Sequence, residues 1–306
     1  MLFQVVERKW WYFLLSGLLI VPGLVFLLLG GLKLGIEFRG GTLLDARFDV
    51  PPATSDVHAA MADLGHEEAI VQSAEGARVL IRTKEMQPDA IAAAQKALEE
   101  RFPSDLIDLQ SSSVSPSFST ELVGNAVQAI AFAFVLIVLL IAFAFRSFGW
   151  TAFRYGLAAI VALLHDAFLV LGMFAILGYF LNVEVDSLFV TAILTVIGFS
   201  VHDTIVVFDR IRENLRINPG EPLNPVINYS VMQTLVRSII TSFTTLLPLF
   251  ALYFFGGYTI RNFALALAIG ITAGTYSSIF NAAQIVSLWQ EIEDRLRHRG
   301  VRPATV

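Results

Sequence analysis

Cysteine is absent from the 306 residues, and charged side chains make up only 15% of them. The lack of cysteine excludes disulfides, iron–sulfur clusters, cysteine-ligated zinc and a cysteine nucleophile. Soluble domains carry about 25% charged residues. A chain that is 56% hydrophobic, with a mean hydropathy of +0.68, is therefore neither an ordinary soluble globule nor a disordered protein. Its net charge of −5 provides no basic face for a nucleic acid, so we expect no nucleic-acid partner.

Enzyme signatures are missing as well. The sequence contains no GxSxG, HExxH or P-loop motif, and its five histidines show no metal-ligand spacing. We therefore expect that the protein is not an enzyme, hydrolyses no nucleotide and binds no metal or organic cofactor.

The few charges are unevenly distributed. Residues 37–121 contain 15 acidic and 7 basic residues, whereas the rest of the chain contains 11 acidic and 14 basic residues. This distribution predicts an acidic soluble segment inserted into a weakly charged, slightly basic remainder.

The remainder contains six segments that are long and apolar enough to cross a bilayer, which takes about 20 residues. They lie at about residues 11–32, 122–145, 156–180, 187–208, 231–255 and 262–288. The first is too long for the apolar region of a signal peptide, and no cleavage site follows it. We predict a membrane all-α six-helix bundle. Residues 1–36 hold the N-terminus and first helix, 121–290 hold the other five, and 291–306 form a C-terminal tail.

The basic residues of the short loops predict the orientation. If both termini lie on one side, eleven arginines and lysines share that side. They are Arg8, Lys9, Arg146, Arg154, Arg210, Arg212, Arg216, Arg295, Arg297, Arg299 and Arg302. Because loops rich in Lys and Arg stay in the cytoplasm, we expect both termini to be cytoplasmic and residues 37–120 to lie outside.

The inserted segment alternates between element types. Strands are expected at 41–49, 68–73, 77–84 and 105–109, and helices at 55–64 and 88–102. The order β-α-β-β-α-β predicts a small α+β domain of the ferredoxin-like kind. The serine-rich stretch 111–120 is expected to be a linker.

Five ionisable residues lie at membrane depth, where each costs about 2.5–3.5 kcal/mol on insertion scales. They are His165, Asp166, His202, Asp203 and Arg237. Asp203 and Arg237 lie at matching depth on consecutive segments, so they can form a static ion pair or a switchable proton site. A carboxylate loses its charge by binding a proton, whereas arginine keeps its charge.

Helical spacing groups several of these residues into faces. Gln233, Arg237, Thr241, Thr244 and Pro248 share one polar face, and Thr191, Thr195, Gly198 and His202 form another. Asp203 lies about 100° around the helix from His202, so the two cannot point the same way. Alternatively, the threonine hydroxyls bond their own backbone carbonyls, and Asp166 and the two histidines are satisfied core residues. Small residues in the sixth segment predict a close-packing face: Ala266, Gly270, Gly274 and Ser278.

Several motifs together resemble the SecF protein-export membrane protein family, over nearly the whole chain. They lie at 38–42, which includes Gly40 and Gly41, at His165-Asp166, at 196–214, at 233–242 and at 255–257. The span 196–214 is the most specific. It departs from the family pattern at Phe199 and His202, where Tyr and Asn are usual, and Glu37 stands where Asp is usual.

The resemblance implies half of a transporter of the resistance-nodulation-division superfamily, in the bacterial inner membrane. It implies a subunit of a SecDF complex that uses the proton-motive force to promote preprotein translocation after the SecA-driven steps, with protons as the coupling ion. The implied partners are SecD, the SecYEG channel with SecA, and the translocating preprotein, with YajC and YidC as further candidates. Two rivals stay open, namely half of a small-molecule exporter of the same superfamily and a purely structural translocon subunit.

The resemblance also assigns roles to residues. Asp203 and Arg237 match the family's proton relay. Accessory candidates are His165, Asp166, His202, Gln233, Thr241 and Thr244, and family-motif positions are Gly40, Gly41, Asp209 and Arg210.

Overall fold

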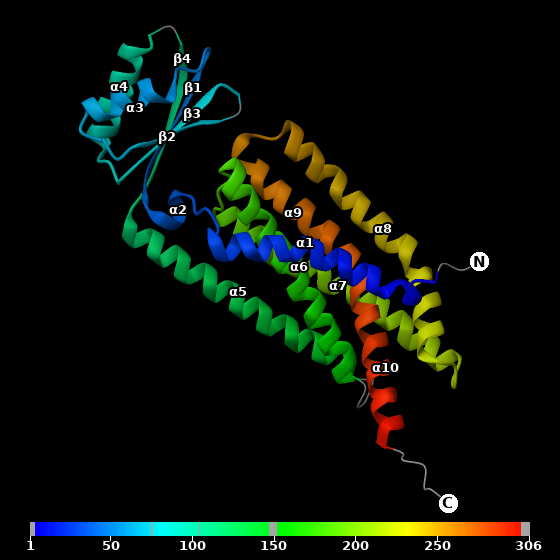
Figure 1. Cartoon of the computed structure of the whole chain (residues 1–306). Coiled ribbons are helices and arrows are strands. Elements are labelled where there is room, and N and C mark those ends of the chain that lie inside the picture. The colour runs from blue at the N-terminus through cyan, green and yellow to red at the C-terminus, as the bar shows by residue number, and fades with distance from the viewer. Residues whose placement is uncertain (1–3, 75, 104, 147–151, 301–306) are drawn as a thin grey trace, which may run out of the picture. The chain divides into compact units, whose positions relative to one another are not determined.

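The computed structural model describes residues 4–74, 76–103, 105–146 and 152–300, and the chain divides into two compact units (Figure 1). The helical unit combines Met1–Lys33 with Ala129–Val306, and the sheet unit is Leu34–Gln128. Of the predicted C-terminal tail, residues 301–306 lie outside the described residues, and so does Arg302.

Long helices make up the helical unit. Their bounds are Val6–Arg8 (η1), Lys9–Leu29 (α1), Pro116–Phe145 (α5, whose first turns belong to the sheet unit), Ala152–Leu181 (α6), Ser187–Ile217 (α7), Leu223–Phe255 (α8), Tyr258–Ser277 (α9), Ser278–Ala282 (the π-helix η3) and Ala283–Gly300 (α10). Within the described residues, six helical stretches are long and apolar enough to cross a membrane, which confirms the predicted number and positions. Helix α7 continues beyond its apolar segment into charged turns, and α8 begins at Leu223, before its apolar segment, in polar turns without charged side chains.

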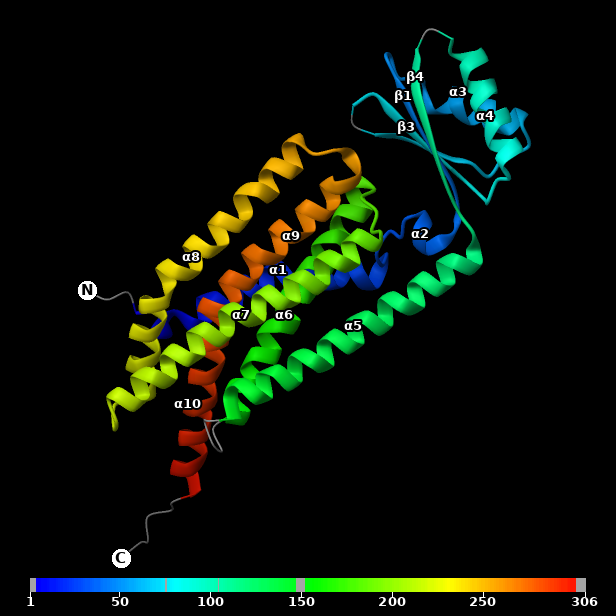
Figure 2. The same cartoon turned by 180° about the vertical axis from the view of Figure 1, so that it is seen from behind.

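Helix α9 lies among α6, α7 and α8 and contacts all three (Figures 1 and 2). The predicted small-residue face explains this close packing. A Cβ built on Gly270 would lie 2.1 Å from Val196 Cγ2 of α7, so only glycine fits there. Helices α1 and α6 also pack closely at a pair of glycines, because a Cβ on Gly23 of α1 would lie 2.7 Å from Gly172 Cα of α6.

Helix α5 is the least packed of the long helices. Only 6% of the most apolar stretch of α5 is buried, compared with 50% of the corresponding stretch of α7. Its contacts with the helical unit lie near its C-terminal end, where Ile141 and Phe145 are buried and the Phe145 ring packs against Tyr155 and Phe208.

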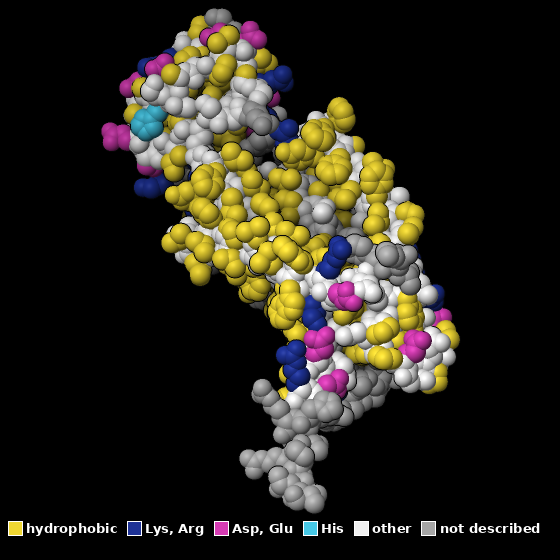
Figure 3. All heavy atoms as spheres, turned by 45° about the vertical axis from the view of Figure 1, so that its right-hand side comes forward, with side chains coloured by type: hydrophobic (Ala, Val, Ile, Leu, Met, Phe, Trp, Pro, Cys, Tyr) yellow, Lys and Arg dark blue, Asp and Glu magenta, His cyan; other side chains and the backbone are white. Residues whose placement is uncertain are grey.

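Apolar side chains cover most of the helical unit's visible face in Figure 3, and the Lys, Arg, Asp and Glu side chains gather toward one end of that unit. Exposed residues of α1 illustrate the pattern, since Trp11 is 72% and Leu18 68% exposed. A surface of this kind matches a lipid environment, where no hydrophobic penalty attaches to outward apolar side chains.

The sheet unit contains four antiparallel strands in the order β2-β3-β1-β4, with α3 and α4 against one face (Figure 1). Its elements are Ile36–Arg39 (α2), Gly41–Phe48 (β1), Thr54–Asp63 (α3), Ile70–Ala74 (β2), Arg78–Thr83 (β3), Pro88–Arg101 (α4) and Leu106–Val114 (β4). After α2, the element order from β1 to β4 is the predicted one. Alternate β1 residues Leu44, Ala46 and Phe48 point into the core.

The expectation of a serine-rich linker at 111–120 is wrong. Strand β4 continues to Val114, with Ser111–Ser113 paired to β1, and α5 begins at Pro116. The serines are compatible with a strand because β4 lies at the edge of the sheet. The Ser113 hydroxyl also has a hydrogen-bond partner on β1, since Ser113 Oγ and Thr42 Oγ1 are 2.9 Å apart. Pro116 then occupies the first helical position, where its missing N–H has no cost.

Candidate functional site

Asp203 lies on the buried face of α7 and is 7% exposed. Ser238 of α8 donates a hydrogen bond of 2.7 Å to Asp203 Oδ1. The other oxygen, Oδ2, is buried and has no partner among the described residues. Asp203 is therefore a carboxylate held between two membrane-depth helices, with one oxygen that no described residue binds.

Arg237 and His202 make no direct contact with this carboxylate among the hydrogen bonds and ion pairs of the described residues. Both are exposed, and no ion pair within 4.0 Å joins Arg237 to Asp203 in the described part of the chain. His202 lies on the exposed stripe with Thr195 and Gly198, as its 100° offset from Asp203 predicts. The static ion pair that the sequence left open is therefore not formed in this structure.

The polar face of α8 is exposed over its length. Its hydroxyls follow the alternative reading, since Thr241 Oγ1 donates to the Arg237 carbonyl at 2.9 Å and Thr244 Oγ1 to the Ile240 carbonyl at 3.0 Å. A threonine hydroxyl that donates to a carbonyl of its own helix does not need a hydrogen-bond acceptor on a second helix. These two hydroxyls therefore fix no contact between helices, although their oxygens can still accept a hydrogen bond.

Gln233 joins α8 to the charged end of α7. Its Oε1 accepts hydrogen bonds from Arg210 Nε at 2.7 Å and from Asn214 Nδ2 at 2.9 Å. Arg210 also pairs with Glu213 at 2.6 Å, and Asp209 pairs with Arg212 at 3.0 Å. The motif residues at this end thus connect the two helices that carry Asp203 and Ser238.

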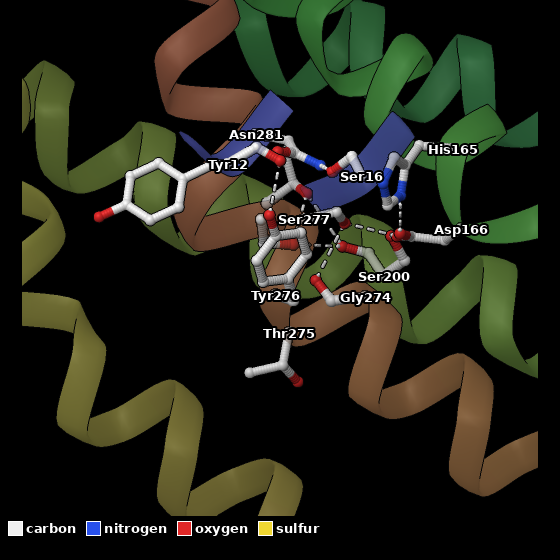
Figure 4. Close-up of polar contacts among 12 residues, drawn as sticks. Tyr12, Ser16, His165, Asp166, Ser200, Gly274, Thr275, Tyr276, Ser277 and Asn281 are labelled. Atoms are coloured by element: carbon white, nitrogen blue, oxygen red, sulfur yellow. Dashed lines mark hydrogen bonds and ion pairs between the residues drawn. The ribbon is translucent and has the colours of Figure 1, made fainter. Parts of the chain in front are cut away.

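Asp166 is the centre of a second buried cluster (Figure 4). It is 1% exposed and accepts three hydrogen bonds, from Ser200 Oγ at 2.5 Å, Ser277 Oγ at 2.7 Å and His165 Nδ1 at 2.9 Å. These donors come from α7, α9 and its own helix α6. Gly274 leaves room for the cluster, because a Cβ there would lie 3.1 Å from Ser200 Cβ.

The two carboxylates sit on a shared framework. Ser200 and Asp203 are about one turn apart on α7, and Thr204 Oγ1 lies 2.8 Å from Ser278 Oγ of η3.

The hydrogen-bond donors Ser200, Ser238 and Ser277 are absent from the sequence-based candidates. Each of them lies either one helical turn from a predicted ionisable residue or at the same depth as one, and this position could have indicated them. Serine is too common in membrane helices for that position alone to single them out.

Gly40 and Gly41 form the turn that leads into β1 of the sheet unit. Their φ values are +76° and +121°, and a Cβ on Gly41 would lie 2.5 Å from the Thr83 carbonyl oxygen. Both positions require glycine, for backbone conformation and for close approach respectively. The structure gives these glycines a conformational role.

Metal ligands do not converge in the described part of the chain, where no group of three or more His, Cys, Asp or Glu side chains could hold an ion.

Two family models match the sequence. The model for the protein export membrane protein SecD/SecF, C-terminal, matches residues 93–292, and the model for the SecD/SecF GG motif matches residues 25–52. The second match contains Gly40 and Gly41.

Curated relatives match over nearly their full length. The protein translocase subunit SecF of Thermobaculum terrenum is 48% identical over 96% of both chains, and that of Anaerolinea thermophila is 39% identical over 99% of both.

Solved structures agree with the sequence matches. The crystal structure of SecDF, a translocon-associated membrane protein from Thermus thermophilus, superposes with a TM-score of 0.83 at 31% identity. The match covers 95% of the present chain and 39% of the SecDF chain. SecDF in its super-membrane-facing form gives a TM-score of 0.68 at 28% identity. The present chain therefore spans about two fifths of the solved SecDF chain, at 39–40%.

Proposed function

The chain belongs to the SecD/SecF protein-export membrane protein family, and we propose that it is the SecF subunit of a SecDF complex that promotes preprotein export in a bacterial inner membrane. Full-length similarity to relatives named SecF supports this role, as do six candidate membrane-spanning helices and the SecDF structural match.

The proton-motive force drives the complex through Asp203. The supporting observation is a carboxyl group that is 7% exposed, tied to α8 by one hydrogen bond, with its second oxygen unpartnered among the described residues. Arg237 cannot lose its charge at any ordinary pH, so it biases the charge state of Asp203 once a partner covers the exposed faces of α7 and α8. Gain or loss of the proton then changes how α7 and α8 pack.

The energy per proton limits each step. One elementary charge that crosses 100 mV yields about 2.3 kcal/mol. A large rearrangement therefore uses several protons, or proceeds in small steps.

The partner that covers those faces is SecD. Thr195 and His202 on α7, together with Arg237 and Thr241 on α8, are exposed polar residues in helices of high hydropathy, which supports a hydrated contact with a neighbouring helix pair. SecYEG with SecA is the machinery that the complex assists, with YajC and YidC as further partners. The helical unit is then one half of a transporter of the resistance-nodulation-division type.

The sheet unit is the extracytoplasmic domain that contacts emerging preprotein. We take it to be ferredoxin-like, because its strands follow β-α-β-β-α-β in the sheet order β2-β3-β1-β4. The termini are cytoplasmic, which the basic residues of the short loops support.

The test replaces Asp203 by asparagine, which keeps the shape and can still accept a hydrogen bond from Ser238 but cannot exchange a proton. Membrane vesicles that carry the variant complex are loaded with a preprotein arrested midway, and completion of its translocation is measured with and without a proton-motive force. We expect co-purification with SecD to be unchanged and the proton-driven stimulation to be lost. Glu221→Gln, an exposed carboxylate in the α7–α8 connection, is the control and keeps full stimulation.

The outcomes separate the rival functions. Normal proton-driven completion in Asp203→Asn vesicles would refute the relay and favour a purely structural subunit. Proton flux through the purified complex that responds to small molecules but not to preprotein would instead favour an exporter.

A further inference from the structure

A line of buried polar side chains follows the last membrane-spanning helix beyond the Asp166 cluster. Ser277, Asn281, Gln284 and Ser287 recur at spacings of four, three and three, so they share one helix face. They are 0%, 3%, 0% and 0% exposed. We call these four residues the polar column. Amides at this burial are unusual in a helix that is otherwise apolar enough to span a membrane.

Several atoms beside and within the polar column have no partner. Gln284 has none for either its Nε2 or its Oε1, and Asn281 Oδ1 and His165 Nε2 are also unpartnered, among the described residues. Asn281 uses its Nδ2, which donates to Ser16 Oγ of α1 at 2.8 Å. An unsatisfied buried polar group costs about 1–3 kcal/mol. Three such atoms along one helix face, with a fourth on His165 of α6, therefore indicate missing hydrogen-bond partners rather than a dry core.

The backbone changes at the same place. The π-helix η3, Ser278–Ala282, interrupts the α-helix between α9 and α10 and contains Asn281. A π-turn lowers the regularity of the backbone hydrogen bonds and occurs frequently at functional sites. Here Asn281 lies within the π-helix and donates to Ser16 of α1.

Polar groups close the column at both ends. At one end, Ser277 donates to Asp166, which also binds His165 (Figure 4). At the other end, Ser287 Oγ donates to Asn224 Oδ1 at 2.7 Å, and Asn224 Nδ2 donates to Glu291 Oε1 at 3.2 Å. Glu291 in turn pairs with Lys9 at 2.5 Å. The column thus extends from a buried carboxylate to a half-buried ion pair near the start of α1.

We propose that the polar column binds a chain of ordered water molecules that connects the Asp166–His165 pair with the Lys9–Glu291 pair. Water matches the chemistry of the unpartnered atoms, because they include both donors and acceptors and a buried water normally makes about three hydrogen bonds to such groups. A cation would satisfy Asn281 Oδ1 and Gln284 Oε1 but would be repelled by the Gln284 Nε2 donor. The waters hydrate His165 Nε2 and give the Asp166–His165 pair a hydrogen-bonded route to the α10 end.

The water chain is independent of Asp203 and of preprotein export. It lies within this one chain, between α1, α6, α9 and α10, and needs neither a membrane potential nor a partner to form. Evidence against the water chain would therefore not refute the proposed proton relay at Asp203, and evidence against the relay would not refute the water chain.

The first measurement detects the water directly. The purified full chain is exposed to a short X-ray pulse, and oxidation of Tyr12, Tyr276 and Phe280, whose rings pack together beside the column, is followed by mass spectrometry. Water bound inside the protein produces hydroxyl radicals locally. We expect Gln284→Leu, which removes both unpartnered atoms at similar volume, to lower the oxidation rate of these rings severalfold.

The matched control is Thr272→Val on α9. The Thr272 hydroxyl donates to the Ala268 carbonyl of its own helix at 2.7 Å, so it needs no water. We expect this variant to keep the oxidation rate of the unsubstituted chain. An equal rate in the Gln284→Leu variant and the control would overturn the proposal.

The second measurement uses the sign of a stability change. If the column were dry, replacement of Gln284 by leucine would relieve two unsatisfied polar atoms, and the midpoint of thermal unfolding would rise. If water molecules bind Gln284, the substitution removes their hydrogen-bond partners, and we expect the midpoint of thermal unfolding to fall. Gln284 is suited to this test because neither of its side-chain polar atoms has a partner among the described residues. A rise of the midpoint in Gln284→Leu would rule out the water chain.

Discussion

At the scale of single residues, the two membrane-depth carboxylates differ in how fully they are satisfied. Asp166 accepts three hydrogen bonds at 1% exposure, whereas Asp203 accepts one and keeps an open oxygen at 7% exposure. Asp166 is therefore held by donors from three helices, whereas Asp203 is held by one donor from a neighbouring helix.

Asp45 in the sheet unit gives a prediction about pH. It lies on β1, its Oδ1 is 3.1 Å from Arg78 Nε, and its side chain is 15% exposed. Burial raises the pKa of Asp45 above its ordinary value of 3.8, the Arg78 guanidinium opposes that rise, and the nearby charge of Asp108 adds to it. Because the folded state binds the proton more tightly than the unfolded state, Asp45 contributes stability below about pH 3.8 that is lost as the pH rises through its folded pKa.

The expected result is a fall in the stability of the sheet unit as the pH rises from about 3.8 through the raised pKa. The measurement is hydrogen exchange of β1 and β3 amides in the full chain, corrected for the intrinsic pH dependence of exchange. Asp45→Asn should remove this part of the slope, whereas Asp63→Asn, an exposed carboxylate on α3, should not. The same slope in all three proteins would contradict this account of Asp45.

Residue-level prediction from sequence succeeded where it depended on helix geometry alone. The offset between His202 and Asp203 places one on the exposed face and the other on the buried face, as 100° per residue requires. It failed where a contact depends on which helices meet. The serine donors to Asp166 and Asp203 come from three different helices, and nothing in one sequence specifies that packing.

At the scale of elements, the contact between α7 and α9 depends on a missing side chain. A Cβ on Gly270 would lie 2.1 Å from Val196 Cγ2 and 2.9 Å from Val196 Cβ. Val196 is β-branched and buried at 1% exposure, so it has little freedom to move aside. The two helices would have to separate, and the shift would pass to Ser200 and Gly274 one turn further along, where Asp166 is bound.

We therefore predict that Gly270→Ala destabilises the chain by about 1–3 kcal/mol, the usual cost of overpacking a core. The measurement is the midpoint of thermal unfolding of the purified chain. Gly17→Ala on α1 is the control, because nothing lies within 4 Å of a Cβ there, and it should be neutral or stabilising by up to about 1 kcal/mol. The double variant Gly270→Ala with Val196→Ala should recover part of the loss. Strictly additive losses would mean that the clash is not the cause.

The elements themselves could be predicted wherever hydropathy or periodicity is strong. The six apolar segments and the strand–helix order of the sheet unit follow from those patterns. The stretch 111–120 was misjudged because serines and a proline are typical of loops, whereas an edge strand and a first helical turn tolerate both. The π-helix had no signal in the sequence. The spacing of Ser277, Asn281 and Gln284 did carry a signal, which the neighbouring small-residue stripe obscured.

At the scale of the whole molecule, the distribution of charge organises both units. The sheet unit contains most of the acidic excess, and the basic residues gather near the ends of the long helices. Loops rich in Lys and Arg resist transfer across the membrane during insertion. The charge pattern that distinguishes the two units therefore also predicts that the basic loops and the sheet unit lie on opposite sides of the membrane.

The absence of cysteine makes this orientation directly testable, because a single introduced cysteine is the only thiol in the chain. Ala92→Cys places one on the exposed face of α4 in the sheet unit, and Pro219→Cys places one in the exposed α7–α8 connection. In spheroplasts treated with a membrane-impermeant maleimide, we expect Ala92→Cys to be labelled at once and Pro219→Cys only after the membrane is permeabilised. The unsubstituted chain should remain unlabelled throughout. Immediate labelling of Pro219→Cys with protection of Ala92→Cys would invert the topology, and the sheet unit could then have no contact with preprotein on the outer face.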